Sequence, residues 1–279
     1  MKLGQLLAVN YIRARLNLLA VFSTKKAAEK AFKIFCTPYY RANKPAPPIF
    51  EKANPLTINL KGNALKGFKW NSGGIKRVLI LHGFESSVKN FDAYVAGLIE
   101  KNYEVIAFDA PGHGVSGGKE ITLPLYIEMI AAIHFMVGPI QSFMAHSFGG
   151  LALAHFMEKT PNENYRMALI APATETTTAI NTFFRFLQLG EGVRTEFEKI
   201  AAAKSGVAAA WFSIPRAMEN INAEVLWVHD KNDDVTPLKD VEPVIKKNYP
   251  NVSFLITEGL GHKKIYRNNK VIKAVVDFL

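Results

Sequence analysis

The sequence predicts an α/β protein with a mostly parallel, eight-stranded sheet flanked by helices, and two observations support this. The chain has 279 residues, of which 49% are apolar, so it can bury one large core. From about residue 77 onward, short apolar segments with strand character alternate with helix-length segments. That alternation favours right-handed crossovers and helices on both faces of the sheet.

The expected strands have two different characters. The first two, 56–60 and 65–70, are separated by a turn-prone Lys-Gly-Asn and predict an antiparallel pair. The third, 77–81, is almost continuously apolar, which is typical of a strand buried on both faces. The remaining strands are expected at 104–109, 140–144, 167–170, 224–228 and 252–256, and the helices at 90–101, 122–137, 148–159, 239–248 and 264–279.

One connection is too long to be a simple crossover. Between residues 170 and 224 there is no convincing strand, but there are helix-like runs at 182–189, 196–203 and 215–220. An insertion of this size in a compact domain is usually functional. We therefore expect a helical cap at about 173–222, over the carboxyl ends of the strands where open parallel sheets bind ligands.

Residues 1–45 form a basic N-terminal extension. Periodic apolar positions predict one or two amphipathic helices, and the Ala-Pro-Pro at 46–48 ends them, so the main domain is expected at 46–279. Against Glu29 alone the extension has nine basic residues, which gives it +8 of the chain's net charge of +10. These residues are Lys2, Arg13, Arg15, Lys25, Lys26, Lys30, Lys33, Arg41 and Lys44.

The location of this charge limits the partners of the protein. Since the main domain carries only +2, its composition does not favour a nucleic-acid surface. The extension has two interpretations, which are helices packed on the main domain or a helix lying weakly on an anionic membrane. Tyr39, Tyr40 and the prolines that follow favour packing within the chain.

Cysteine usage and the N-terminal residues bear on location. Cys36 is the only cysteine, which excludes a disulfide framework and fits a reducing compartment. Arg13 and Arg15 interrupt the apolar N-terminal residues, and the uncharged run 16–22 is too short for a membrane span or a clean signal peptide. We expect a soluble, cytoplasmic protein.

The seven-residue stretch Met-Ala-His-Ser-Phe-Gly-Gly, which begins at Met144, is expected to join a strand to a helix that begins at Phe148. Ser147 would then lie in a tight turn at the carboxyl edge of the sheet. Such a nucleophile elbow needs small residues two positions before and after the serine, here Ala145 and Gly149. The turn also directs the N–H of Phe148 toward an oxyanion beside the serine.

On these residues, the sequence from about 53 to the C-terminus resembles the esterase-like serine hydrolases of the α/β-hydrolase fold. The family's Gly-x-Ser-x-Gly appears at 145–149 as Ala-His-Ser-Phe-Gly, with alanine at the first glycine. The resemblance implies this fold, with Ser147 as the nucleophile.

Two further loops carry the resemblance. Leu-His-Gly-Phe at 81–84 is similar to the family's oxyanion loop, which implies that the N–H of Phe84 completes an oxyanion hole with that of Phe148. Asp-Ala-Pro-Gly-His-Gly at 109–114 is similar to the family's D-x-P-G-x-G loop. His113 in that loop is assigned a structural role, because the family places its base elsewhere.

The acid is expected after the penultimate strand. The stretch 228–237 resembles the family's H-G-x-x-D-x-x-V-P, with the acid four residues before the proline, which selects Asp233 relative to Pro237. Asp234 and Asp230 remain alternatives, and Asp230 occupies the glycine position of the pattern.

The base is expected after the last strand. Gly-Leu-Gly-His at 259–262 implies that His262 removes the serine proton, which Asp233 assists by orienting the imidazole. The chain order Ser147, Asp233, His262 matches that of the family.

These residues predict a carboxylesterase-like enzyme that cleaves a small-molecule ester through an acyl-enzyme on Ser147, without a cofactor or metal ion. The choice of an ester rests on analogy with the commonest reaction of the fold. Thioester or peptide hydrolysis by the same residues, and non-catalytic binding of a small molecule, stay open.

Within the predicted cap, three phenylalanines and a leucine fall on little more than one helical turn, at 183–187. That is more apolar surface than one stripe needs, so Phe183 and Phe184 are predicted to contact substrate. The alternative is that all four side chains pack inside the cap or on the main domain.

Overall fold

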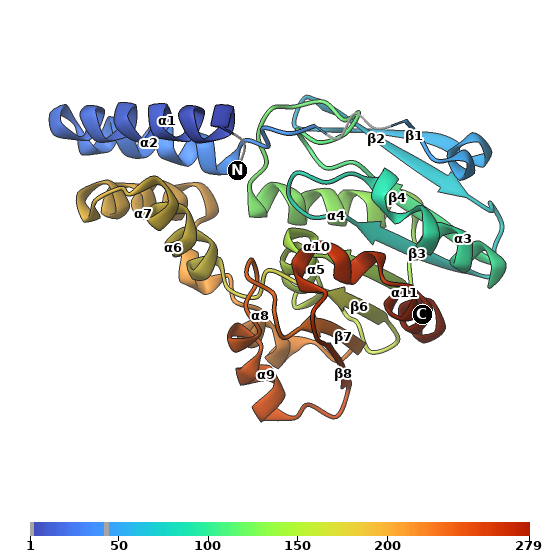
Figure 1. The fold of residues 1–279 in the computed structure, drawn as a ribbon. Helices are drawn as coiled ribbons and strands as arrows, with labels where there is room; N and C mark the ends of the chain where they lie inside the picture. The colour runs from blue at the N-terminus through green and yellow to red at the C-terminus, as the bar shows by residue number, and fades with distance from the viewer. Residues whose placement is uncertain (1–2, 42–44) are drawn as a thin grey trace. The chain divides into compact units, whose positions relative to one another are not determined.

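The computed structural model describes residues 3–41 and 45–279 and contains two compact units (Figure 1). A helical unit comprises the N-terminal residues to Thr37 and the insertion 175–213, and an α/β unit comprises the remainder. The division falls between Thr37 and Pro38, whereas the sequence placed a boundary near 45. Lys2 and Lys44, two of the nine basic residues of the extension, lie outside the described residues.

The α/β unit contains one eight-stranded sheet with the strand order β1-β2-β4-β3-β5-β6-β7-β8, which confirms the predicted fold class. β2 runs antiparallel to both of its neighbours, and the other adjacent pairs are parallel. The strands are β1 (Asn54–Leu60), β2 (Asn63–Trp70), β3 (Lys76–Leu81), β4 (Tyr103–Phe108), β5 (Ser142–His146), β6 (Arg166–Ile170), β7 (Glu224–Asp230) and β8 (Val252–Thr257).

The central strands are apolar because helices cover both of their faces. Every residue of β4 and β5 is buried, as are the last four of β3. Side chains alternate between the faces along a strand, so Val78 and Ile80 share one core with Tyr94 and Val275 of helices α3 and α11. α5 packs on β3 and β5. The helices of this unit are α3 (Asp92–Glu100), α4 (Leu123–Val137), α5 (Phe148–Met157), α8 (Ile214–Ala217), α9 (Glu242–Lys247), α10 (Gly261–Lys264) and α11 (Asn269–Phe278).

Two expected elements of this unit differ from the observed ones for identifiable physical reasons. The strand expected at 140–144 is β5, at 142–146, because it stays paired through His146, which lies opposite Ile170 of β6. The single helix expected at 264–279 is not continuous, because residues 265–267 form a short 3-10 helix and α11 begins only at Asn269. Asn268 interrupts it, because its extended backbone and its side chain, which accepts from the N–H groups of Lys270 and Val271, start a new helix.

The helical unit joins two segments that are far apart in the sequence. α1 (Leu3–Phe22) and α2 (Thr24–Cys36) come from the extension, and α6 (Thr176–Leu187) and α7 (Glu191–Ser205) from the insertion (Figure 1). They share an apolar core, in which the small side chains of Ala27, Ala28 and Ala31 let α2 and α7 approach closely. The extension was expected to pack on the main domain, and its apolar side chains pack against the helices of the insertion.

Within 3–41 and 45–279, no helix combines the length and the apolar character that a membrane span requires.

Candidate active site

Ser147 is the single residue between β5 and α5. Its φ of 53° and ψ of −121° are unusual for a residue with a side chain, and a conformation of this kind costs about 1–3 kcal/mol. The backbone around it is fixed, because its N–H donates to the carbonyl of Ile170 (3.1 Å) and its carbonyl accepts from Gly150 (2.9 Å) and Ala173 (3.0 Å). The turn therefore has the strained geometry predicted for a nucleophile elbow.

Glycine is required at two positions beside the serine. A Cβ on Gly149 would lie 2.7 Å from the carbonyl oxygen of His82, so α5 could not approach β3. A Cβ on Gly83 would lie 2.9 Å from Cβ of Ser147. Ala145, which replaces the first glycine of the family motif, is fully buried opposite Leu81, so the fold accommodates its methyl group.

The structure brings the three predicted catalytic residues into one hydrogen-bonded chain. Oγ of Ser147 lies 3.0 Å from Nε2 of His262, and Nδ1 of His262 lies 2.9 Å from Oδ2 of Asp233. Each side chain comes from the carboxyl end of a different strand, β5, β7 or β8, and each residue is buried. A proton can therefore pass from the serine hydroxyl to an imidazole whose other nitrogen faces a carboxylate.

Thr236 is a member of this arrangement that the sequence did not reveal. Its Oγ1 lies 2.8 Å from Oδ2 of Asp233 and 3.2 Å from Nδ1 of His262. The N–H groups of Thr236 and Val235 donate to Oδ1 of Asp233 at 2.8 and 2.9 Å. Burial alone would raise the pKa of Asp233, but hydrogen bonds from His262 and Thr236 outweigh it and lower that pKa, so the carboxylate is ionised at neutral pH.

The other two aspartates of this loop have different surroundings. Asp230 is buried, and its Oδ2 accepts from the hydroxyl of Thr257 (2.6 Å) and the N–H of Leu260 (3.0 Å), which links the loop after β7 to the loop after β8. Asp234 is exposed. The distances therefore favour Asp233 as the partner of His262.

The two N–H groups predicted to form the oxyanion hole belong to Phe84 and Phe148. Phe148 is the first residue of α5, where N–H groups have no acceptor within the helix. The loop containing Phe84 is held by buried groups on either side. Tyr126 donates its hydroxyl to the carbonyl of His82 (2.7 Å), and the N–H of Glu85 donates to Nε2 of His113 (3.0 Å).

Three buried histidines support this region. His113 has the structural role expected from the sequence, because its Nδ1 also lies 2.9 Å from the carbonyl of Pro111. Nε2 of His82 accepts from the N–H of Ala110 at 2.9 Å. Burial lowers the pKa of His82 to about 4 and is the main cause that lowers the pKa of His113 and of His146 to about 3, so these rings are neutral at neutral pH.

His146 lies directly behind the predicted base. Its ring centroid is 4.9 Å from that of His262 and 4.4 Å from that of Tyr266, and its Nε2 is 3.4 Å from the carbonyl oxygen of His262. The buried ring of His146 thus packs against the imidazole of His262 and helps to position it.

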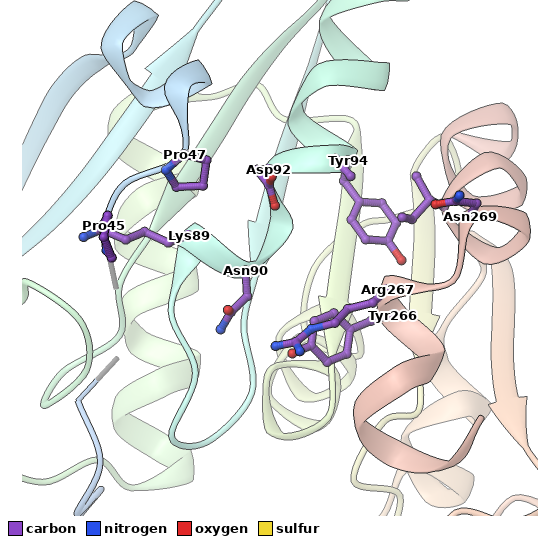
Figure 2. Close-up of a pocket in the computed structure, with 11 residues that line it drawn as sticks. Pro45, Pro47, Lys89, Asn90, Asp92, Tyr94, Tyr266, Arg267 and Asn269 are labelled. Atoms are coloured by element: carbon purple, nitrogen blue, oxygen red, sulfur yellow. The ribbon is translucent and has the colours of Figure 1, made fainter. Parts of the chain in front are cut away.

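A separate cavity with a volume of about 340 Å³ is lined in part by Tyr266 (Figure 2). It is lined by residues of the segments 45–47, 89–94 and 266–272, so none of the three hydrogen-bonded residues borders it. Figure 2 shows the hydroxyl of Tyr94 directed toward Tyr266 and Arg267. This hydroxyl is buried and has no hydrogen-bond partner within the described part of the chain.

Phe183 and Phe184, the predicted substrate contacts, belong to the core of the helical unit. The ring of Phe184 lies 5.2 Å from that of Phe197, and the ring of Phe183 lies 5.1 Å from that of Phe35. Phe184 is only 5% exposed. Packing inside the unit accounts for both side chains, and a role in substrate binding stays a prediction.

Comparison with known proteins agrees with this fold. A family model described as serine aminopeptidase, S33, matches residues 75–205, a range that includes Ser147 but not Asp233 or His262. A serine hydrolase-like protein of Danio rerio is 22% identical over 191 residues. This match covers 66% of the chain and 56% of the zebrafish protein, so the chain spans little more than half the length of that relative.

Two solved structures show the extent of the similarity. An esterase of Pyrococcus furiosus superposes with a TM-score of 0.66 and 17% identity, over 88% of this chain and 96% of that one. The thioesterase domain from the curacin biosynthetic pathway gives a TM-score of 0.59 and 15% identity, over 81% and 98%. Taken with the sheet order, these similarities show that the chain has the α/β-hydrolase fold.

Proposed function

We propose that this protein hydrolyses a carboxylic ester through an acyl-enzyme on Ser147. The observation that carries the proposal is the hydrogen-bonded chain in which His262 lies 3.0 Å from Oγ of Ser147 and 2.9 Å from Oδ2 of Asp233. A serine hydroxyl is a weak nucleophile at neutral pH, and an adjacent imidazole oriented by a carboxylate is what activates it.

In the acylation step, Oγ of Ser147 attacks the ester carbonyl while Nε2 of His262 takes the hydroxyl proton. The imidazolium that forms is stabilised by the ionised Asp233, to which its Nδ1–H donates. Negative charge develops on the carbonyl oxygen, where the N–H groups of Phe84 and Phe148 would donate. Each such donor contributes about 3–4 kcal/mol to stabilising the tetrahedral intermediate.

The intermediate then breaks its carbon–oxygen bond to the alcohol, and His262 gives its proton to the departing oxygen. The acyl group remains on Ser147. Water attacks this second ester with the same proton transfers, first to His262 and then back to Oγ of Ser147. The acid is released and the starting state is restored.

Two alternatives use the same residues. The matching family model describes a serine aminopeptidase, and one similar structure is a thioesterase domain, so amides and thioesters are rival substrates. An ester is favoured because the Pyrococcus furiosus structure is an esterase and because esters are the commonest substrates of this scaffold. A non-catalytic binder is disfavoured, because binding alone would not need Ser147, His262 and Asp233 to form one hydrogen-bonded chain.

A substrate panel tests the proposal. The full-length protein is assayed with p-nitrophenyl esters of graded acyl length, acyl thioesters and aminoacyl p-nitroanilides, with Ser147→Ala as the control. We expect the esters to have the highest kcat/KM and the control to lose nearly all turnover. Faster cleavage of thioesters or anilides would replace the ester assignment. No turnover of any substrate by the folded protein would favour a binding function.

In this proposal the substrate is a small-molecule ester, and nucleic acid has no role. The cytoplasmic location expected from the sequence also stays a prediction.

A further inference from the structure

Helix α1 is apolar on two opposite faces, and the helical unit uses only one of them. On the inner face, Leu16 is buried and Ile12 and Leu19 pack against the core shared with α2, α6 and α7. On the outer face, large apolar side chains are exposed to solvent, which we call the apolar stripe. It consists of Leu7, Tyr11, Leu18, Val21 and Phe22.

The stripe follows the period of the helix. Leu7, Tyr11, Leu18 and Phe22 are separated by intervals of four, seven and four residues, so their side chains lie along one face. The exposed fractions are 63% for Leu18 and 80% for both Val21 and Phe22. A helix that is apolar all round is normally buried, and an exposed row of this kind marks an interaction surface.

Basic side chains lie next to the stripe. Arg15 is exposed on the same side of α1, and Lys25 and Lys26 follow Phe22 at the start of α2, where both are exposed. Residues 3–37 contain six basic side chains and a single acidic one, Glu29. The surface therefore pairs apolar side chains with an excess of cations.

We propose that the apolar stripe docks on an anionic lipid bilayer. Leucine and aromatic side chains next to lysine and arginine match the boundary between acyl chains and negatively charged headgroups. Leu18 and Phe22 would enter the acyl boundary, and Arg15, Lys25 and Lys26 would contact the headgroups. A second copy of the chain is a poorer occupant, because a symmetric interface would bring two basic surfaces together.

This inference goes beyond the proposed hydrolase activity and does not depend on it. Docking through α1 would hold the enzyme where lipid-derived esters are abundant, but the binding itself involves no catalytic group. Ser147→Ala should therefore bind vesicles as the native protein does, so failure of one proposal leaves the other intact.

Vesicle sedimentation of the full-length protein tests the apolar part. The vesicles contain phosphatidylcholine either alone or mixed with phosphatidylserine. Leu18→Gln/Phe22→Gln removes apolar side chains from the stripe without entering the core. Its control is Phe135→Gln, which removes a ring that is 93% exposed on α4 of the other unit. We expect the stripe variant to lower the partition coefficient by at least about tenfold. The control should stay within about twofold.

The electrostatic part is tested with matched charge variants. Arg15→Gln/Lys25→Gln/Lys26→Gln removes the cations next to the stripe. The control is Lys76→Gln/Lys239→Gln/Lys270→Gln, which removes the same charge from exposed positions of the α/β unit. At low salt the first variant should bind anionic vesicles at least about tenfold more weakly than the control. Raising the salt concentration to the physiological level should also weaken the binding of the native protein to anionic vesicles.

Several results would overturn the proposal. These are no sedimentation with anionic vesicles, equal binding to neutral vesicles, or unchanged binding by the folded stripe variant, whose fold is checked by circular dichroism. Analytical ultracentrifugation without lipid measures whether a second copy of the chain binds the stripe instead. A dimer that becomes a monomer in the stripe variant, with no vesicle binding, would assign the stripe to contact between copies of the chain.

Discussion

The hydroxyl of Thr236 lies 2.8 Å from Oδ2 of Asp233, the same oxygen that lies 2.9 Å from Nδ1 of His262. The backbone N–H of Thr236 lies 2.8 Å from the other oxygen of that carboxylate. One residue thus holds both oxygens of Asp233 and fixes the plane in which the carboxylate faces the imidazole.

Thr236→Val tests this positioning role, because valine keeps the shape and the N–H but removes the hydroxyl. We expect kcat to fall about tenfold with little change in KM, since a hydrogen bond to a charged group is worth about 1.5–3 kcal/mol. Thr236→Ser should restore most of the rate. Native kcat in Thr236→Val, measured on the best ester of the panel, would show that the hydroxyl has no part in positioning.

Gly83→Ala tests the close approach between the oxyanion loop and the elbow. The new Cβ would lie 2.9 Å from Cβ of Ser147, so the loop must move and carry the N–H of Phe84 with it. We expect kcat to fall by about 100-fold or more, as when one oxyanion donor is lost. Gly190→Ala is the matched control, because nothing lies within 4 Å of its Cβ. Equal activity of the two variants would contradict the assignment of the loop.

The buried histidines predict a loss of stability in acid. Burial lowers the pKa of His82 to about 4 and is the main cause that lowers the pKa of His113 to about 3, both below the ordinary value near 6.5. Between these values the unfolded chain binds more protons than the folded one. The stabilisation is therefore complete above about pH 6.5 and decreases as the pH falls, by up to about 1.4 kcal/mol per pH unit for each histidine.

Urea unfolding at a series of pH values measures this effect. The native protein should show a free energy of unfolding that declines steadily from pH 7 toward pH 4. His113→Gln should give a shallower slope, because it removes one of the titrating groups. A free energy that is constant over this range would mean that the rings are protonated in the folded state.

Substitution of Phe183 and Phe184 distinguishes a structural role of these side chains from a role in substrate binding. Phe184→Ala should lower the stability of the helical unit by about 3–5 kcal/mol, because its ring is 5% exposed and lies against Phe197. If packing is the only role, the ratio of kcat/KM for short and long acyl esters stays unchanged in Phe183→Ala. A shift of that ratio in the folded variant would instead support the predicted contact with substrate.

The elbow could be predicted from the sequence because it depends on local chemistry. A serine between an apolar strand and a helix, with small residues at fixed offsets, identifies Ser147, although the contact that requires Gly149 is with the carbonyl of His82, far away in the sequence. The end of β5 was misplaced by two residues, because His146 is polar and looks like a strand end, yet it is buried against Tyr266.

Other features depend on contacts that a single sequence does not specify. The spacing of Ile12, Leu16 and Leu19 shows that one face of α1 is buried, but not that its partners come from the insertion 175–213. Thr236 occupies the valine position of the family pattern, so the pattern does not predict a hydroxyl there. The role of this hydroxyl follows only from the structure, in which it lies within hydrogen-bond distance of both Asp233 and His262.

The most direct test of the proposed function is labelling of the folded protein with a fluorophosphonate, followed by peptide mass mapping. The proposal predicts a single adduct on Ser147, absent in Ser147→Ala and formed far more slowly in His262→Ala, because the serine depends on its base. Asp234→Asn should label at the native rate. Labelling that persists in Ser147→Ala, or no labelling of the folded native protein, would contradict the account.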